Sequence, residues 1–148
     1  MNKIEFKINQ SNNSDILEHL KKCNDQFIPP LSSRVSIDEY SVKIFEKAIR
    51  FELWDGLKLI GLTAAYKNNE SNSLFITNVS VEKEFSGNGL ANKLIEEVIN
   101  YCKTNGYKSI KLEVKKNNFK AISLYTKFNF KTEKEQNDSL FLGYTNLN

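Results

Sequence analysis

The sequence predicts an α+β domain whose mixed β-sheet is antiparallel in its first half and carries helices packed on it. Three observations lead to this prediction. The dipeptide Asp55-Gly56 separates two apolar runs, which is a strong signal for a β-hairpin. A Gly-x-Gly turn, Gly87-Asn88-Gly89, joins an apolar strand pattern to an amphipathic helical pattern. Along the chain the patterns follow the order β-α-α-β-β-β-α-β-α-β-β, which implies a mixed sheet.

Length and composition indicate one domain over residues 1–148, with an ordinary globular core. The net charge is +3, and Arg34 and Arg50 are the only arginines, so the chain lacks the clustered arginines of a nucleic-acid groove. No apolar run approaches the ~20 residues of a membrane span, and the start lacks the apolar block of a secretory signal. We therefore expect a cytoplasmic protein, in which Cys23 and Cys102 are reduced thiols.

The first part of the chain reads as a strand and a helix. Apolar and polar residues alternate over Ile4–Ile8, which predicts the strand. A helical pattern follows over Ser14–Cys23. Its apolar face consists of Ile16, Leu17 and Leu20. His19, the only histidine, lies beside this face, and we expect it at the exposed surface of the helix, where it offers almost nothing for metal ligation.

A second helix follows a break in the pattern. Two prolines within Phe27–Ser33 forbid a helix there. Ser36, with Glu39 three residues later, then forms a capping-box pattern, and this helix is predicted to run to about Ala48.

The remaining patterns alternate between strands and helices. Strands are predicted at Ile49–Trp54, Leu57–Lys67, Leu74–Val81 and Ser109–Val114. Helices are predicted at Leu90–Thr104, which Asn105-Gly106 ends, and at Asn118–Phe128. The segments Phe130–Lys134 and Leu140–Tyr144 read as a final hairpin.

The Gly-x-Gly turn admits three interpretations. A dinucleotide-binding turn requires a third glycine at position 92, which is Asn92, and a parallel sheet that the preceding hairpin strands argue against. A Walker-type loop requires a lysine after its last glycine, but Leu90 follows Gly89. The third interpretation is a phosphate-binding turn of another kind, which presents backbone N–H groups at the start of a helix.

Two segments resemble one family in order and spacing. Val79-Ser80-Val81, followed by Ser86-Gly87-Asn88-Gly89-Leu90-Ala91, is similar to the first motif of the Gcn5-related N-acetyltransferase (GNAT) superfamily. The segment Asn118-x-x-Ala121-x-x-Leu124-Tyr125-x-Lys127-x-x-Phe130 resembles its second motif. Ser86 stands where that family usually has glutamine or arginine, which removes a side-chain contact to the pyrophosphate. Asn129 replaces the usual glycine, a mild change because asparagine tolerates the left-handed conformation.

The resemblance implies a GNAT-like fold with splayed central strands, acetyl-CoA as co-substrate and no metal. It implies cofactor binding by the edge of the strand before the turn, by the turn itself and by the start of the last helix. These residues are Val79, Val81, Ser86, Gly87, Asn88, Gly89, Leu90, Ala91, Asn118 and Tyr125.

Three residues are implied in the chemistry. The N–H of Val79 would polarise the thioester carbonyl, and Tyr125 would protonate the departing thiolate. Residues 74–78 carry no acid, so Glu113 is the nearest candidate base; a water chain ending on Glu113 or no dedicated base are the alternatives. Simpler structural roles compete with these: a core aromatic for Tyr125, a helix N-cap for Asn118 and a solvent-facing strand position for Glu113.

The acceptor pocket is implied to form from the first helices, their connecting loop and the early strands. Arg34, Tyr40 and Asn78 are its candidate residues, and Arg34 could equally cap a helix. We expect transfer of an acetyl group to a primary amine of a small molecule. A catalytically silent acyl-CoA sensor and a protein or peptide N-acetyltransferase are the alternatives. By analogy with the fold, Leu140–Tyr144 is the candidate edge for a homodimer.

Overall fold

A computed structural model describes residues 3–147 of the chain. The helices are α1 (Asn13–Cys23), α2 (Ile37–Lys47), α3 (Leu90–Thr104) and α4 (Phe119–Lys127). The strands are β1 (Ile4–Ile8), β2 (Ile49–Asp55), β3 (Lys58–Asn68), β4 (Ser73–Val81), β5 (Ser109–Lys115), β6 (Lys131–Gln136) and β7 (Ser139–Tyr144). Apart from three short 3₁₀ turns, their order is the predicted one.

The strands form one mixed sheet in the order β1-β2-β3-β4-β5-β7-β6. Strands β1 to β4 pair antiparallel, as predicted, and β4 then pairs with β5 in parallel. One expectation is wrong: Leu140–Tyr144 is no edge, because β7 pairs with β5 on one side and with β6 on the other. The sheet ends instead at β6, all of whose residues are exposed and four of which are charged, a composition that discourages pairing with another chain.

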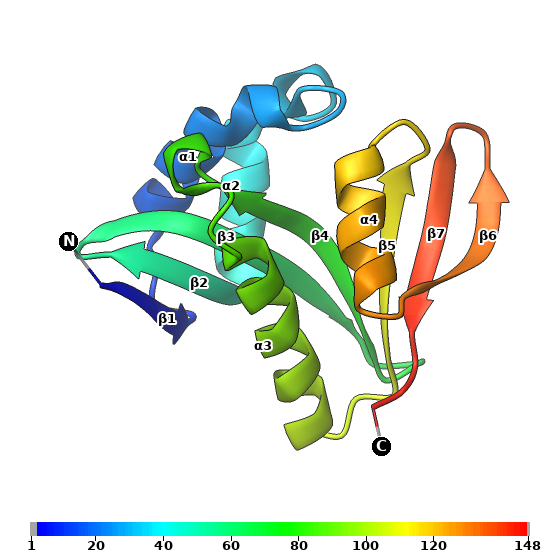
Figure 1. Ribbon diagram of the computed structural model, residues 1–148. Helices are drawn as coiled ribbons and strands as arrows, with labels where there is room; N and C mark the ends of the chain where they lie inside the picture. Colours follow the sequence, from blue (N-terminus) through cyan, green and yellow to red (C-terminus); the bar gives the residue numbers. More distant parts are fainter. Residues whose placement is uncertain (1–2, 148) are drawn as a thin grey trace.

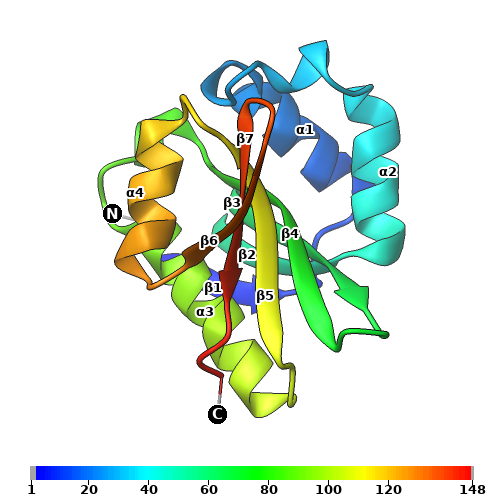
Figure 2. The same ribbon diagram turned by 90° about the vertical axis from the view of Figure 1, so that its right-hand side faces the viewer.

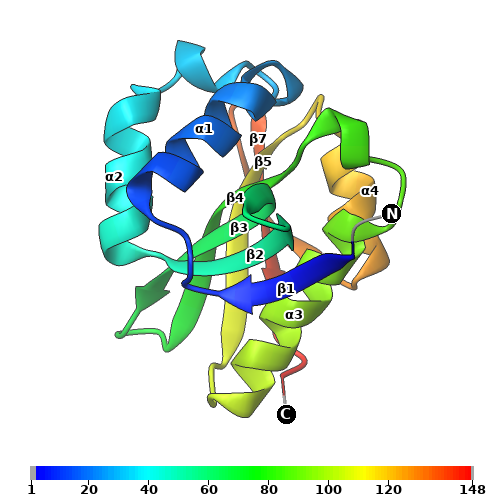
Figure 3. The same cartoon turned by 90° about the vertical axis from the view of Figure 1, so that its left-hand side faces the viewer.

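Helices cover both faces of the sheet (Figures 1 and 3). Helices α3 and α4 lie on one face, over a core that includes Phe51, Leu74 and Leu112. Helices α1 and α2 lie on the other face, over a core that includes Leu20 and Leu62. Because successive side chains of a strand point to opposite faces, this layering assigns each strand residue to one side of the sheet.

The central strands separate after a short paired stretch. Strand β4 pairs with β5 only from Ser73 to Ile76, and the rest of the two strands diverge (Figure 1; Figure 2 shows the same strands from the side). A register shift against β3 leaves Thr77 as an extra residue in β4, the signature of a β-bulge. Beyond the bulge, the edge of β4 that faces β5 therefore pairs with no other strand of the described chain.

The two N-terminal helices have side-chain caps. Ser36 accepts a hydrogen bond from the N–H of Glu39, so the predicted cap of α2 is confirmed, although only this half of the box is formed. A complete capping box, which the sequence analysis missed, opens α1: Asn12 and Asp15 each accept from the other's N–H.

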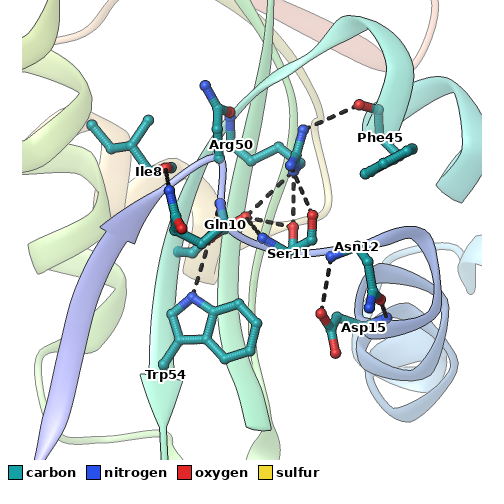
Figure 4. A network of polar contacts seen from close by, with 10 residues as sticks. Ile8, Gln10, Ser11, Asn12, Asp15, Phe45, Arg50 and Trp54 are labelled. Atoms are coloured by element: carbon teal, nitrogen blue, oxygen red, sulfur yellow. Dashed lines mark hydrogen bonds and ion pairs between the residues drawn. The ribbon is translucent and has the colours of Figure 1, made fainter. Parts of the chain in front are cut away.

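A buried ion pair ties the start of α1 to β2 (Figure 4). The Arg50 side chain donates to both oxygens of Ser11 and to the carbonyl oxygen of Phe45. The Glu52 carboxylate, 3.4 Å from the Arg50 guanidinium, accepts from the N–H groups of Gln10 and Ser11 and from the Trp54 indole. This network fixes the position of α1, one wall of the region described below.

Within residues 3–147, no helix combines the length and the apolar character that crossing a membrane requires. The same residues hold no group of three or more histidine, cysteine, aspartate or glutamate side chains arranged to bind a metal ion.

Candidate active site

The Gly-x-Gly turn leads directly into α3 and leaves donors free. Gly87 and Gly89 have φ values of 82° and 75°, in the left-handed region that other residues adopt at a cost. No side chain caps α3, and its first main-chain bond runs from the N–H of Lys93 to the carbonyl of Gly89. The N–H groups before Lys93 therefore lie at the positive end of a 15-residue helix, where an anion is stabilised.

The two polar side chains of the turn bond within the turn itself. Ser86 donates its hydroxyl proton to the carbonyl of Lys83 at 2.7 Å, and Asn88 donates its amide to the carbonyl of Phe85 at 3.2 Å. The one proton of the Ser86 hydroxyl is thus used within the turn, and binding of a pyrophosphate here depends mainly on the backbone.

The open edge of β4 presents backbone donors next to this turn. Glu82 donates its N–H to the carbonyl of Ile60 on β3, at 2.9 Å. Since main-chain groups of a strand alternate in direction, the N–H groups of Val79 and Val81 point away from β3, toward the free edge. The carbonyl of Val81 on this edge accepts a hydrogen bond from the Gln26 side chain, which reaches it from the α1–α2 connection.

Tyr125, the candidate general acid, lies on α4 and is a buried residue of the core. It is 7% exposed, and its ring packs against that of Phe130, at 5.6 Å between centroids. Burial raises the pKa of Tyr125 above its ordinary value, so the phenol keeps its proton near neutral pH. Asn118 caps α4 by accepting from the N–H of Ala121 at 3.3 Å, so its N-cap role is realised and its amide donors are left for another partner.

The opposite face of β4 lies beneath α1 and α2. The Tyr40 hydroxyl, on α2, donates to the carbonyl of Thr77 at 2.7 Å, at the bulge. Burial raises the pKa of Tyr40, partly offset by hydrogen bonds from Thr77 and Asn78 and by the charge of Arg34. Asn78 is buried beside the bulge, whereas Arg34 is exposed in the connection between the helices.

Glu113 shares this face of the sheet. Its neighbours Leu112 and Val114 belong to the core under α3 and α4, so the Glu113 side chain points to the α1 and α2 side, and it is exposed. It lines an open hollow of about 260 Å³ beside the β6–β7 turn, together with Lys115 and Asp138. Those two residues pair with each other at 3.1 Å, whereas Glu113 forms no ion pair with another residue of the described chain.

A buried polar cluster at the end of β4 was missed by the sequence analysis. The expectation that His19 is exposed is wrong: its exposed fraction is 1%, and it contacts Ser80 and Glu82. The signal was available in the sequence. The buried residues of α1 are Ile16, His19, Leu20 and Cys23, which follow the i, i+3, i+4, i+7 spacing of one helix face.

Comparison with known proteins identifies the family. The sequence profile of the acetyltransferase (GNAT) family matches residues 14–130, which is most of the chain. The chain belongs to this family, whose general activity is transfer of an acetyl group from acetyl-CoA. No curated protein matches the sequence significantly.

Solved structures share the fold at low sequence identity. Arabidopsis thaliana NAA60 in complex with a bisubstrate analogue is 21% identical, with a TM-score of 0.78 over 97% of this chain and 98% of that one. The ribosomal-protein-S18-alanine N-acetyltransferase of Escherichia coli is 18% identical, with a TM-score of 0.75 over 98% and 94%. PaiA N-acetyltransferase of Thermoplasma acidophilum, in complex with coenzyme A, is 14% identical, with a TM-score of 0.76 over 95% and 99%.

The residues present suit acetyl-CoA as co-substrate. A pyrophosphate requires converging donors with room to approach, and a Cβ added at Gly87 or Gly89 would meet no atom within 4 Å, so no other part of the described chain crowds these two positions. A pantetheine arm, which carries amide groups, requires an unpaired strand edge, and β4 offers one beyond Ile76.

Proposed function

We propose that this protein transfers the acetyl group of acetyl-CoA to a primary amine that approaches from the α1 and α2 face of the sheet. One observation carries the proposal. The pairing of β4 with β5 ends at Ile76, which leaves the last part of β4 with a free edge, and the chain continues from this edge into the glycine turn. The edge supplies the Val79 and Val81 donors, and the turn supplies those of residues 87–91. Together they match the amide and phosphate groups along one CoA molecule.

In this proposal the N–H of Val79 donates to the thioester carbonyl oxygen as negative charge develops there. Tyr125 donates its proton to the leaving sulfur. In water this transfer is uphill, because a phenol has a pKa of ~10 and a thiol a pKa of ~8.5. Burial does not reverse this order, because it raises the pKa of Tyr125 as well as the pKa values of the Cys23 and Cys102 thiols, which rise to about 12. The transfer therefore depends on a general acid positioned beside the leaving sulfur.

The acceptor amine must lose a proton to become a nucleophile. Glu113 is the candidate base, because it lies on the acceptor face, exposed and without a cationic partner in the described chain. A water chain that ends on Glu113, or deprotonation in solution, would serve the same purpose. Arg34, Tyr40 and Asn78 are proposed to form the opposite wall of the acceptor site.

We favour a small-molecule amine as the acceptor, bound at the open hollow of about 260 Å³ that Glu113 lines. A protein or peptide acceptor is the second candidate: the hollow is open, and the printed name of one structural neighbour states a ribosomal-protein alanine as its substrate. A silent acyl-CoA sensor is the third, favoured by the inward-turned Ser86.

A panel assay separates these candidates. CoA release from acetyl-CoA is measured with amino acids, aminosugars, polyamines, aminoglycosides and short peptides with free N-termini. Turnover with a small amine but with no peptide supports the first candidate, and turnover with peptides alone supports the second. Acetyl-CoA binding without turnover on the whole panel contradicts the proposed transfer and favours the sensor.

A further inference from the structure

The only histidine of the chain is buried at the point where α1 crosses the end of β4. The Nε2 of His19 lies 2.8 Å from the Oγ of Ser80, and its Nδ1 lies 3.6 Å from a carboxylate oxygen of Glu82. Ser80 and Glu82 are themselves buried, with exposed fractions of 8% and 3%. One side chain of α1 thus contacts Ser80 near the end of β4 and Glu82 just after it, on the face opposite to α3.

The hydrogen bonds of the cluster determine which of its atoms donate a proton and which accept one. Ser80 donates its one hydroxyl proton to the Oδ1 of Asn78, at 2.8 Å. The Nε2 of His19 therefore carries a proton and donates it to the Oγ of Ser80. Nδ1 then faces Glu82, and a proton on Nδ1 makes this contact an ion pair.

Other charged groups also face the cluster. Lys58 of β3 and Lys22 of α1 lie 3.1 Å and 3.7 Å from the second carboxylate oxygen of Glu82. Burial raises the pKa of Glu82, but the close contacts with His19 and Lys58 outweigh it, so the pKa lies below its ordinary value and Glu82 is a carboxylate.

Cys23 and His19 together have the composition of a thiol nucleophile site, but this thiol is neither ionised nor accessible. The Sγ of Cys23 lies 3.8 Å from the Nε2 of His19. Burial, together with the negative charge of Glu82, raises the pKa of this thiol to about 12. The thiol is also fully buried, so neither a reactive thiolate nor access for a substrate is available.

The position of the cluster connects it to the cofactor edge. Ser80 and Glu82 alternate with Val79 and Val81, whose N–H groups point to the free edge. Glu82 also begins the segment that leads to the glycine turn. Its carbonyl accepts a hydrogen bond from the N–H of Phe85 at 2.9 Å. A side chain that holds Ser80 and Glu82 therefore holds both the open edge of β4 and the start of the turn.

We propose that His19 is a positioning residue for acetyl-CoA: by bridging Ser80 and Glu82 it fixes the edge of β4 and the glycine turn in the arrangement that one CoA molecule spans. This inference rests on the proposed cofactor site. His19 touches neither the cofactor nor the reacting atoms, so its removal raises the KM for acetyl-CoA and leaves kcat at saturating acetyl-CoA nearly unchanged.

The sole histidine makes a direct test possible, with CoA as the probe. NMR of the histidine ring in the wild-type protein reports on His19 alone as CoA is added. Calorimetry gives the Kd of CoA for the wild type, His19→Leu, His19→Gln and Cys23→Ala. The glutamine keeps a donor for Ser80, whereas Cys23→Ala removes a thiol 3.8 Å from the His19 ring but leaves the contacts of His19 with Ser80 and Glu82 in place. Urea unfolding of each variant establishes that it is folded under the binding conditions.

We expect CoA to shift the His19 ring signals, His19→Leu to weaken CoA binding about fivefold or more, and His19→Gln to weaken it less. Cys23→Ala should bind within about twofold of the wild type. An unmoved ring signal at saturating CoA overturns the inference, even if His19→Leu does not fold, and so does unchanged affinity in a folded His19→Leu. Failure of the wild type itself to bind CoA is a different result: it overturns the proposed cofactor site.

Discussion

The hydroxyl of Ser86 donates to the carbonyl oxygen of Lys83 at 2.7 Å, within the turn that precedes α3. The side chain at the position where the family usually has glutamine or arginine is therefore directed back into its own loop. If acetyl-CoA is bound by the backbone alone at this position, a longer donor should improve binding.

The change Ser86→Arg should lower the Kd of acetyl-CoA about three- to tenfold. Hydrogen bonds to a charged group contribute about 1.5–3 kcal/mol, and ordering the arginine side chain offsets up to ~2 kcal/mol of this. Calorimetry with Ser86→Ala as the control checks the prediction, and the control should bind within about twofold of the wild type. A large loss of affinity in Ser86→Ala would show that the hydroxyl itself holds the cofactor.

The left-handed glycines of the turn have a matched control elsewhere in the chain. Gly87 and Gly56 have φ values of 82° and 60°, and an added Cβ would meet no atom within 4 Å at either position. Alanine at either site therefore introduces backbone strain of about 1–2 kcal/mol without a clash. Gly87→Ala should raise the KM for acetyl-CoA about tenfold as the turn relaxes, whereas Gly56→Ala should lower stability alone. Equal KM values for the two variants would contradict the proposed role of the turn.

The carboxylate of Glu113 can be tested as the base. Glu113→Gln should reduce kcat/KM for the acceptor about a hundredfold near neutral pH, with partial recovery at alkaline pH, where the amine loses its proton in solution. Glu135→Gln is the control, because Glu135 is an exposed acid of β6 whose partner, Lys116, lies 3.9 Å away. Wild-type pH profiles for both variants would show that the acceptor is deprotonated without Glu113.

The buried ion pair of Arg50 and Glu52 should dominate the stability of the N-terminal region. Glu52 is fully buried, so Glu52→Ala leaves the Arg50 guanidinium in the core without its counter-charge. The expected loss in the free energy of unfolding is about 3–5 kcal/mol, measured by urea denaturation. A loss below about 1 kcal/mol would mean that Ser11 and the Phe45 carbonyl satisfy Arg50 by themselves.

Local patterns predicted most of the fold. The Asp55-Gly56 hairpin, the alternation in Ile4–Ile8 and the helical spacing after Gly89 each depend on neighbouring residues, and each element lies within a few residues of its predicted bounds. The order of the strands in the sheet depends on long-range pairing. For this reason Leu140–Tyr144 was expected at an edge although β7 lies between β5 and β6.

The backbone part of the candidate site could be predicted, whereas in its buried polar part the burial of His19 could be predicted but its partners could not. The glycine turn and the Val79–Val81 edge follow from a contiguous motif. The contact of His19 with Ser80 and Glu82 joins residues about sixty positions apart, across a helix and a strand, and no local pattern pairs them. The interpretation of His19 as a surface residue failed because the apolar face of α1 was assigned through Leu17 rather than through Cys23.

The most direct test of the account is the turnover of Tyr125→Phe beside the wild type, with the best acceptor from the panel and with acetyl-CoA affinity measured in parallel. Phenylalanine keeps the ring that packs against Phe130 and removes only the hydroxyl. We predict a loss in kcat of about tenfold or more, with acetyl-CoA binding within about threefold of the wild type. Unchanged kcat in Tyr125→Phe would contradict the account, because another group would then protonate the leaving thiolate.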